Sequence, residues 1–251
     1  MPDTTLKVLT YNIHKGFSIG NLRFILHDIK DSLRQIDADV VFLQEIHGER
    51  SITRQRFDDW PNNRQFEFLA DEVWPHHAYG KNAIYKSGHH GNAILSKYPF
   101  ISWENIDVSI MKTASRSLLH GTIQAPGIEQ KIHIICVHLG LFHRERERQL
   151  KTLVTRINSH VPGDEPLIIA GDFNDWRSRA ERYLHQDLGV NEAFKTSHGS
   201  YALTFPAMLP VLSMDRIYFR GLEVIDCRRL HGKPWNRLSD HTPLLADFRL
   251  I

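Results

Sequence analysis

Three short apolar runs in the sequence each end in polar residues that can take part in chemistry. Val40–Leu43 is followed by Gln44 and Glu45, Ile132–Val137 by His138, and Leu167–Ala170 by Gly171 and Asp172. Short apolar runs of this kind are typical of strands that are buried on both faces. Carboxylates and imidazoles at the ends of such strands are the groups that a site needs to bind a metal ion and activate water. The pattern therefore predicts a hydrolase.

Amphipathic helices are predicted before the first run and after the second. Leu22, Ile25, Leu26, Ile29, Leu33 and Ile36 recur at helical spacing, and Leu150, Leu153, Val154 and Ile157 form an apolar face behind the charged stretch 144–148. A shorter helix is expected around residues 66–74.

The remaining apolar patterns predict strands. They cover residues 6–13, several stretches between 78 and 124, and then 214–219, 222–225 and 244–250. The strand–helix–strand opening favours mixed sheets covered by helices, while the strand-rich middle and end argue against a purely parallel fold. Two packed sheets flanked by helices fit best. Because the sequence shows no repeat and no linker, we expect a single domain over residues 1–251.

Composition and charge are those of an ordinary globular protein. Apolar residues make up 41% and charged residues 24% of the chain, and the net charge is only +2, so no global basic field points to nucleic acid. A local basic patch would still suffice for a nucleic-acid substrate. The two cysteines, Cys136 and Cys227, lie in apolar, strand-like contexts, which favours buried free thiols over a disulfide.

The start of the sequence does not resemble a targeting segment. Residues 1–5 lack the basic and apolar regions of a signal peptide, and no apolar run approaches the roughly 18 residues of a membrane span. We therefore expect a soluble, cytoplasmic protein without a stable membrane span. No obligate protein partner is evident, and a monomer is expected.

Two strand ends offer oxygen ligands for a metal ion. Glu45 directly follows its strand, and a carboxylate there suits Mg²⁺, which takes one or two protein oxygens and keeps several waters. Asn12, near the end of the first strand, can supply an amide oxygen to the same metal or to a phosphate. Taken alone, each has a plainer interpretation, Glu45 as a cap of the following loop and Asn12 as a turn residue.

The segment Gly171-Asp172-Phe173-Asn174 is more specific. Its glycine permits a tight turn, and residues two apart on an extended segment project to the same side. Asp172 and Asn174 can therefore hold one water molecule between them. A turn stabilised by one of these two side chains is the alternative.

Two histidines complete the set of candidates. His138 follows its strand, and His241 begins a strand from a loop. Asp215 can orient the His241 imidazole, as a buried carboxylate sets the tautomer of a catalytic histidine. The alternatives are a structural role for His138 and a salt bridge between Asp215 and a neighbouring arginine. One shared site explains the candidates better than a separate plain role for each.

Six short motifs follow one another along the chain in a recognisable order. They are Thr10-Tyr11-Asn12-Ile13, Leu43-Gln44-Glu45, Val137-His138-Leu139, Gly171-Asp172-Phe173-Asn174, Asp215-Arg216-Ile217-Tyr218 and Ser239-Asp240-His241. This order resembles the endonuclease/exonuclease/phosphatase superfamily, which includes DNase I-like nucleases. The segments 12–16, 89–93 and 171–176 look closest to the bacterial YbhP-like group. The resemblance covers essentially the whole chain. It implies an α/β fold, a four-layer α/β/β/α sandwich of two mixed β-sheets flanked by helices, with the site at one edge of both sheets.

The resemblance also implies a metal site. Glu45 would be the main Mg²⁺ ligand, with Mn²⁺ able to substitute for the magnesium ion. Asn12 and Asp240 would complete the metal shell, directly or through water. Asp215 would orient His241.

Substrate contacts are implied in the same way. His138 and Asn174 would donate hydrogen bonds to the phosphoryl oxygens, and Asp172 would align the attacking water. Either Asp172 or His241 would be the general base. Arg116 resembles a contact to a substrate phosphate, and an ordinary surface arginine is the alternative.

The expected chemistry is hydrolysis of a phosphodiester bond by in-line attack of water. The residues Ile46-His47 after Glu45 differ from the pattern of exonuclease III-like repair enzymes, and the basic specificity motifs of inositol phosphatases are not found. A nuclease acting on DNA or RNA is favoured, although near-neutral charge argues against tight duplex binding. A phospholipid or sphingolipid phosphodiesterase is the alternative, and a non-catalytic binder of phosphorylated ligands is the third.

The lipid alternative depends on one apolar segment. Residues 205–212, Phe-Pro-Ala-Met-Leu-Pro-Val-Leu, form an amphipathic loop that is able to touch lipid. The better interpretation from the sequence is a buried loop or a part of the core.

Overall fold

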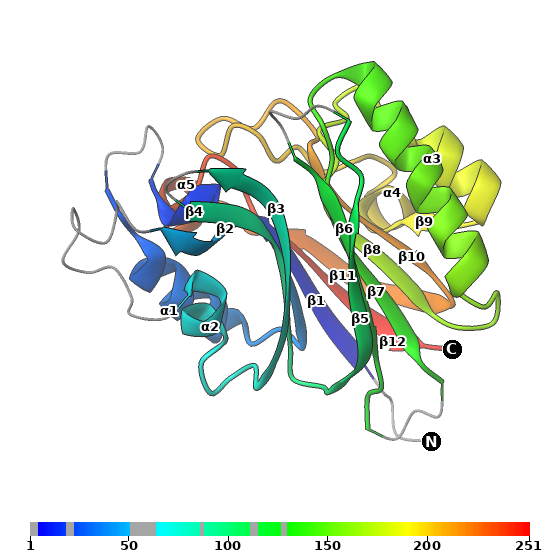
Figure 1. The fold of residues 1–251 in the computed structure, drawn as a ribbon, viewed down its shortest axis with the longest axis horizontal. Helices are drawn as coiled ribbons and strands as arrows, with labels where there is room; N and C mark the ends of the chain where they lie inside the picture. Colours follow the sequence, from blue (N-terminus) through cyan, green and yellow to red (C-terminus); the bar gives the residue numbers. More distant parts are fainter. Residues whose placement is uncertain (1–4, 19–22, 51–63, 86–87, 111–114, 127–129) are drawn as a thin grey trace.

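Two six-stranded sheets face each other and helices cover their outer faces, as the computed structural model shows for residues 5–18, 23–50, 64–85, 88–110, 115–126 and 130–251 (Figure 1). The first sheet has the order β11-β12-β1-β2-β4-β3, with β1 (Thr5–Asn12), β2 (Val40–Arg50), β3 (His76–Tyr85), β4 (Gly88–Ser96), β11 (Leu222–Arg229) and β12 (Leu244–Leu250). The second has the order β5-β6-β7-β8-β10-β9, with β5 (Phe100–Asp107), β6 (Ser117–Ile123), β7 (Ile132–His138), β8 (Leu167–Asp172), β9 (Asn191–Glu192) and β10 (Asp215–Arg220). The predicted four-layer sandwich is confirmed.

A parallel pair of strands lies at the centre of each sheet. β1 and β2 run parallel with Asn12 opposite Gln44, and β7 and β8 run parallel with His138 opposite Asp172. The other described strand pairs are antiparallel. Because parallel strands end at the same edge, both pairs deliver their last polar residues to one end of the sandwich, the upper end in Figure 1.

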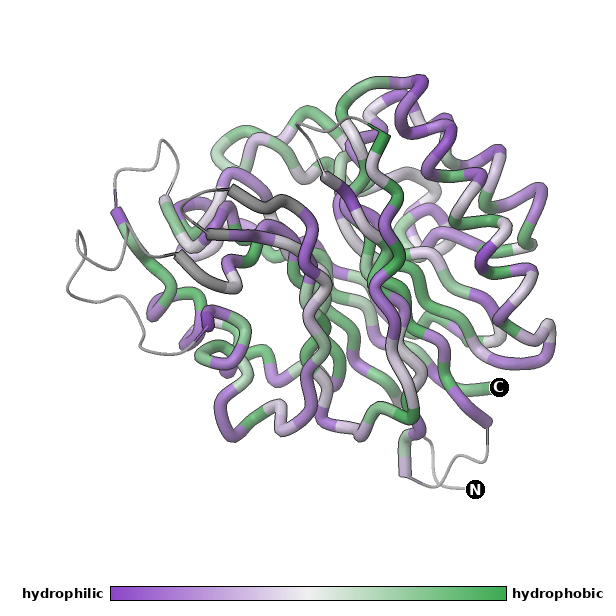
Figure 2. Tube along the Cα trace, in the orientation of Figure 1, coloured by the Kyte–Doolittle hydropathy of each residue, from purple (hydrophilic) through white to green (hydrophobic). Residues whose placement is uncertain are grey.

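Three cores separate the four layers and explain the unbroken apolar runs. On β2, Val40 and Phe42 pack between the sheets, whereas Val41 and Leu43 pack under the helices of the first sheet. Strands of the second sheet alternate in the same way between the inter-sheet core and a third core under a long helix. Successive strand residues point to opposite faces, so a strand covered on both sides must be apolar throughout (Figure 2).

The helices close the outer faces. α1 (Leu26–Ile36) and α2 (Gln65–Ala70) lie on the first sheet and α3 (His143–His160) on the second, while α4 (Ala193–His198) packs against β10 and β11 (Figure 1). Short helical segments η1 (His14–Gly16), η3 (Arg182–Gln186) and α5 (Trp235–Leu238) complete the described elements. No helix among the described residues is long and apolar enough to cross a membrane.

Two element ends differ from the sequence prediction. The helix expected over 66–74 ends at Ala70, because the next residue, Asp71, takes a positive φ of 45°. The strand expected over 222–225 continues to Arg229. A bulge after Val224 shifts its register against β12, and the pairing then resumes as far as Arg229. Leu22 of the first predicted helix lies outside the described residues. Both cysteines are free and buried, as predicted.

Candidate active site

The polar residues predicted at the strand ends meet at one edge of the sandwich. Asn12 and Glu45 come from the first sheet, at the end of β1 and within β2. His138, Asp172 and Asp215 come from β7, β8 and β10 of the second sheet, and His241 lies just before β12. The site is therefore shared between the two sheets, which explains why its residues are spread along the whole sequence.

The Asp172 carboxylate lies at the centre of this group. Its Oδ2 accepts a hydrogen bond of 3.1 Å from Nδ2 of Asn12, and its Oδ1 accepts one of 2.9 Å from the backbone N–H of Asn174. Nε2 of His138 lies 3.6 Å and Nε2 of His241 lies 3.9 Å from the same Oδ2. Burial is the largest influence on Asp172 and raises the pKa of its carboxyl group. One carboxylate thus faces two imidazoles and an amide in a nearly water-free setting.

His241 is held by Asp215. Its Nδ1 lies 2.7 Å from Oδ2 of Asp215, and both side chains are buried. Burial alone would lower the pKa of His241, but the carboxylates of Asp215 and Asp172 outweigh it and raise that pKa to about 10. The contact leaves Nε2 of His241 facing Asp172.

The hydroxyl group of Ser239, the first residue of the tripeptide 239–241, makes two structural hydrogen bonds. Its Oγ donates a 2.7 Å hydrogen bond to the backbone oxygen of Asn12 and accepts one of 3.3 Å from the backbone N–H of His241. A buried Ser239 therefore ties the loop that carries His241 to the end of β1. The ring of Phe205 packs against the imidazole at a centroid distance of 5.0 Å.

The segment η1 places an imidazole and an ammonium group against two carboxylates. Nζ of Lys15 lies 3.2 Å from Oε2 of Glu45, and Nδ1 of His14 lies 3.4 Å from Oδ1 of Asp240. His14, Lys15 and Glu45 all have positive φ, between 44° and 61°. Such backbone conformations are uncommon outside glycine and cluster at functional sites. Neither pair was predicted from the sequence.

Glu45 has the properties of a metal ligand. Burial, its largest influence, would raise the pKa of the Glu45 carboxyl group, but His138 and Lys15 hold it at about 2, so the group is ionised. Among the described residues, none donates a hydrogen bond to its buried Oε2 beyond the ion pair with Lys15. A free carboxylate oxygen is what a hard divalent cation requires. Asn12 fits as a partner because its Oδ1 points toward η1, where it accepts the backbone N–H of His14 at 3.1 Å.

A second group of possible ligand atoms lies beside the first. One ligand atom from each of Asp172, Asp215 and His241 falls within 4.8 Å of the others. Oδ1 of Asp215 has no hydrogen-bond partner among the described residues. The residues present thus fit a metal ion, and the ion's identity is a matter for experiment.

His138, Arg116 and Asn174 surround the loop after β7. Burial lowers the pKa of His138 well below its ordinary value, and the charge of Arg116 adds to this effect. Arg116 is half-buried, and its Nε donates to the backbone oxygen of Leu139 at 3.3 Å. Nδ2 of Asn174 donates to the same oxygen at 2.9 Å. The predicted contacts of these residues to a phosphate remain predictions.

His90 is a site neighbour that sequence reasoning did not select. It lies buried on β4, where burial lowers its pKa to about 4 while the Glu45 carboxylate opposes the shift. In the sequence, His90 stood out only as part of the segment 89–93, which resembles the bacterial YbhP-like group. That resemblance did not indicate a role for the residue.

Comparison with known proteins agrees with this geometry. The model of the endonuclease/exonuclease/phosphatase family matches residues 9–241. The chain belongs to this family. The uncharacterized protein YbhP of Escherichia coli K12 is 44% identical over 254 residues, covering 100% of both chains. A UPF0294 protein of Yersinia pseudotuberculosis is 35% identical over 122 residues, which is 47% of this chain and 42% of the relative.

Several solved structures share the fold. A Beutenbergia cavernae endonuclease/exonuclease/phosphatase superposes with a TM-score of 0.80 at 19% identity, covering 98% of this chain and 72% of that one. D. rerio TDP2 complexed with a single-strand DNA product has a TM-score of 0.71 at 19% identity and 98% and 99% coverage. The human nocturnin catalytic domain with bound sulfate has a TM-score of 0.75 at 19% identity and 98% and 95% coverage.

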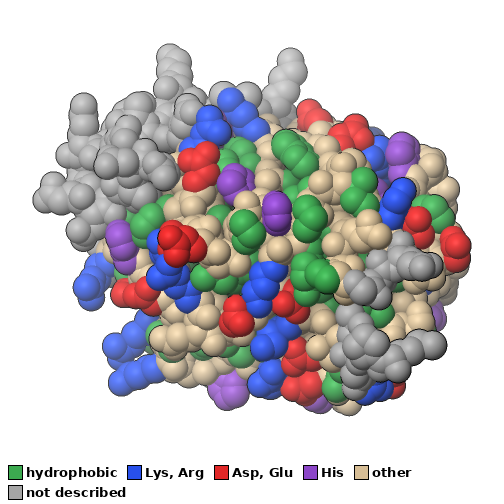
Figure 3. Space-filling model, turned by 90° about the horizontal axis from the view of Figure 1, so that it is seen from below, with side chains coloured by type: hydrophobic (Ala, Val, Ile, Leu, Met, Phe, Trp, Pro, Cys, Tyr) green, Lys and Arg blue, Asp and Glu red, His purple; other side chains and the backbone are tan. Residues whose placement is uncertain are grey.

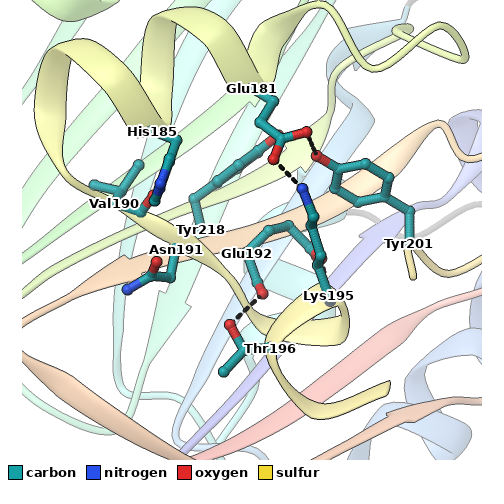
Figure 4. Close-up of a pocket in the computed structure, with 9 residues that line it drawn as sticks. All are labelled: Glu181, His185, Val190, Asn191, Glu192, Lys195, Thr196, Tyr201 and Tyr218. Carbon is teal, nitrogen blue, oxygen red and sulfur yellow. Dashed lines mark hydrogen bonds and ion pairs between the residues drawn. The ribbon is translucent and has the colours of Figure 1, made fainter. Parts of the chain in front are cut away.

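A separate cavity of about 240 Å³ lies near η3 and α4 (Figure 4). The Glu181 carboxylate there accepts a hydrogen bond of 2.8 Å from the Tyr201 hydroxyl and pairs with the Lys195 ammonium group. None of the predicted site residues lines this cavity. Because the Glu181 carboxylate is already paired, the cavity offers no counterpart to the arrangement around Asp172.

Proposed function

We propose that this protein hydrolyses phosphodiester bonds in a reaction that depends on a divalent metal ion, Mg²⁺ or Mn²⁺, with water attacking phosphorus in line. The observation that carries the proposal is the buried Asp172 carboxylate, which Asn12, His138 and His241 approach while Asp215 fixes His241 from behind. Family membership supports a phosphoesterase of this kind. The intact set of polar residues argues against the third possibility, a relative that only binds phosphorylated ligands.

Each residue has a task that follows from its position. Asp172 aligns the attacking water and accepts its proton, because its Oδ2 faces the site. His241, held through Nδ1 by Asp215, presents Nε2 to the charge that develops on the phosphoryl group. His138 presents a second imidazole to the same oxygens, from the other side of Asp172.

The remaining groups bind charge. Glu45 would hold the metal ion, with Asn12 and Asp240 as further ligands directly or through water. When bound there, a divalent ion neutralises charge on the phosphoryl oxygens and the leaving group. Arg116 and Asn174 bind the phosphate from the loop side.

The experiment uses a small soluble phosphodiester, bis(p-nitrophenyl) phosphate, with Mg²⁺ or Mn²⁺. We expect hydrolysis by the wild-type protein, its loss with EDTA, and a fall of kcat by at least about a hundredfold in Asp172→Asn and His241→Gln. Asp226→Asn, which changes an exposed aspartate on β11, is the matched control and should keep the wild-type rate. The proposal would be refuted if the wild-type protein did not hydrolyse this substrate. It would also be refuted if both site variants hydrolysed the substrate at the wild-type rate.

Nucleic acid is the first natural substrate class to assay, since the sequence favours it and the TDP2 structure holds a single-strand DNA product. Figure 3 views the molecule from below, at the end away from the strand-end site, and acidic and basic side chains are interleaved on that face. With a net charge of only +2, the chain has no global basic field for binding a duplex. Plasmid DNA and single-stranded RNA are suitable test substrates.

A further inference from the structure

Exposed apolar side chains gather around the proposed active site. We call six of them the apolar collar: Leu141, Phe142, Trp176, Met208, Leu209 and Val211. These are six of the twelve exposed large hydrophobic residues in the described part of the chain. Met208 and Leu209 are 74% and 73% exposed and Phe142 is 63% exposed. Large apolar side chains exposed on several loops of one site mark an interaction surface, so the collar calls for a functional explanation.

The first two parts of the collar are attached to the loops that carry His138 and Asn174. Leu141 lies three residues after His138, and Trp176 two residues after Asn174. Arg146 joins them, because its guanidinium group lies 5.2 Å from the Trp176 ring and its Nη1 donates to the backbone oxygen of Leu141 at 2.5 Å. These side chains therefore stand at the rim of the site.

The third part is attached to the loop of His241. The backbone N–H of Ala207 donates a 2.7 Å hydrogen bond to the backbone oxygen of Asp240, and Ala207 itself is buried. Met208 and Leu209 follow at once and point outward, so the sequence-based expectation of a buried segment is wrong for these two residues. The loop is fixed at its base beside the catalytic histidine while its apolar tip faces solvent, at the upper end of the molecule in Figures 1 and 2.

The charges between the collar residues have one sign. Arg144 lies two residues after Phe142, and Arg177 and Arg179 follow Trp176, and all three arginines are exposed. The segments 139–144, 175–180 and 203–214 contain a single acidic residue, Asp175, which is buried. An anionic lipid layer has an apolar interior below negatively charged head groups. Apolar side chains that alternate with exposed cations are complementary to such a layer.

We propose that the apolar collar docks this enzyme on an anionic phospholipid surface, so that its substrates are the phosphodiesters of lipid head groups. The proposal rests on the proposed phosphodiesterase function and names its substrate class. Nucleic acid explains the collar less well. Stacking on bases requires aromatic faces, whereas four of the six collar residues are aliphatic or thioether side chains that gain nothing from a phosphate backbone.

The test compares a substrate in a membrane with one in solution. Vesicles of phosphatidylcholine with 30% phosphatidylglycerol (about a third, enough for an anionic surface) are incubated with wild-type protein and with the double variant Met208→Ser/Leu209→Ser. Binding is measured by co-sedimentation, and hydrolysis by release of phosphorylated head group. Each rate is divided by the rate of the same protein on bis(p-nitrophenyl) phosphate. We expect the double variant to lose vesicle binding and this ratio to fall about tenfold or more.

Controls keep the result specific. Ile225→Ser removes an exposed apolar residue from β11, away from the collar, and should leave binding and ratio at wild-type values. Vesicles of phosphatidylcholine alone should bind less wild-type protein, because the three exposed arginines then lack an anionic partner. Thermal unfolding of each variant checks that the fold is intact, which the high exposure of both residues leads us to expect.

Other outcomes separate the two proposals. Wild-type protein that binds vesicles but hydrolyses neither substrate would refute the phosphodiesterase function and leave the docking surface standing. Hydrolysis of bis(p-nitrophenyl) phosphate without vesicle binding would overturn the lipid proposal alone. A double variant that loses binding or cleavage of single-stranded DNA while keeping vesicle binding would assign the collar to nucleic acid. A wild-type dimer that the double variant converts to a monomer would assign it to a second copy of the chain.

Discussion

Nδ1 of His241 lies 2.7 Å from Oδ2 of Asp215, on a strand that begins directly opposite the Asp172 end of β8. A carboxylate can only accept a hydrogen bond, so the N–H of Nδ1 is the donor. The other ring nitrogen then faces Asp172. One contact thus keeps a proton on Nδ1 and sets the direction of the imidazole ring.

Replacing Asp215 by asparagine should disable this arrangement without changing its size. We expect the Asp215→Asn variant to have a kcat on bis(p-nitrophenyl) phosphate lower by about two orders of magnitude, with KM changed far less. The amide removes the negative charge that raises the pKa of His241 and that orients its ring. Steady-state kinetics measure the effect, with Asp226→Asn as control. A variant that retained half of the wild-type kcat would show that Asp215 does not position His241.

Metal binding should respond in opposite directions to changes in two paired residues. Glu45→Gln removes the ionised carboxylate, and we expect Mn²⁺ affinity to fall by about tenfold or more. Lys15→Met removes the ammonium group 3.2 Å from Oε2 of Glu45, and we expect Mn²⁺ to bind several-fold more tightly because a competing cation is gone. Calorimetric titration measures both constants without any substrate.

The matched control for this pair is Glu223→Gln, since Glu223 is an exposed carboxylate on β11. Its Mn²⁺ affinity should equal that of the wild type. Equal affinities in Glu45→Gln and wild type would remove Glu45 from the metal site.

The strand ends could be predicted from the sequence because both faces of the central strands are covered. An apolar run that stops at Gln44, His138 or Asp172 marks the point where a strand leaves the core. Parallel pairing then brings these ends to one edge, so the position of the site follows from simple rules. The residues of the site were therefore accessible from pattern and motif alone.

The pairing of Lys15 with Glu45 was not accessible in that way. It depends on left-handed backbone conformations at His14, Lys15 and Glu45, which tertiary contacts impose and which residue type does not signal. The exposure of Met208 and Leu209 was missed for a related reason. Hydrophobic pattern predicts burial, and it carries no information about a loop whose base is held by backbone hydrogen bonds while its tip faces solvent.

Stability should depend strongly on a buried ion pair next to the site. Arg216 is fully buried, its Nη2 donates to the backbone oxygen of Asp175 at 2.6 Å, and its guanidinium lies 4.1 Å from the Tyr201 ring. Arg216→Met leaves the Asp175 carboxylate buried without this partner. We expect the free energy of unfolding to fall by about 3–5 kcal/mol.

Urea denaturation measures this change. Arg228→Met, which removes an exposed arginine from a neighbouring pair, should cost less than about 1 kcal/mol. Adding Asp175→Asn to Arg216→Met should recover part of the loss, because no uncompensated buried charge then remains. A loss that is not reduced in the double variant would assign the effect to packing alone.

A chain of polar groups far from the strand-end site should make stability fall in acid. Nε of Arg156 donates to Nδ1 of His120 at 3.2 Å, so Nε2 of His120 donates to Nδ1 of His133 at 3.0 Å. Nε2 of His133 in turn donates to Glu165 at 2.5 Å. This order requires a neutral His120, and burial lowers its pKa from 6.5 to about 3.

The sign of the effect follows from proton binding. Between pH 6.5 and about 3 the unfolded chain binds a proton at His120 that the folded chain does not, so stability is fully present above pH 6.5 and is lost as the pH falls. His120→Gln should reduce the slope of unfolding free energy against pH by up to about 1.4 kcal/mol per pH unit in this range. Urea denaturation from pH 7 to pH 4 measures the slope, with exposed His231→Gln as control. Parallel curves for His120→Gln and wild type would contradict the assignment.

Two hydrogen bonds beneath the site connect the sheets directly. Asn12 of the first sheet donates to Asp172 of the second, and Nε2 of Gln44 donates to Sγ of Cys136 at 3.4 Å. Half of the reacting groups therefore belongs to each sheet, and their separation is set by the thickness of the apolar layer between them. A substitution deep in that layer that thins or swells it would move Asp172 relative to Asn12 while every strand stays intact. Catalytic rate should accordingly report on the inter-sheet spacing, and heating should abolish turnover before it melts the secondary structure.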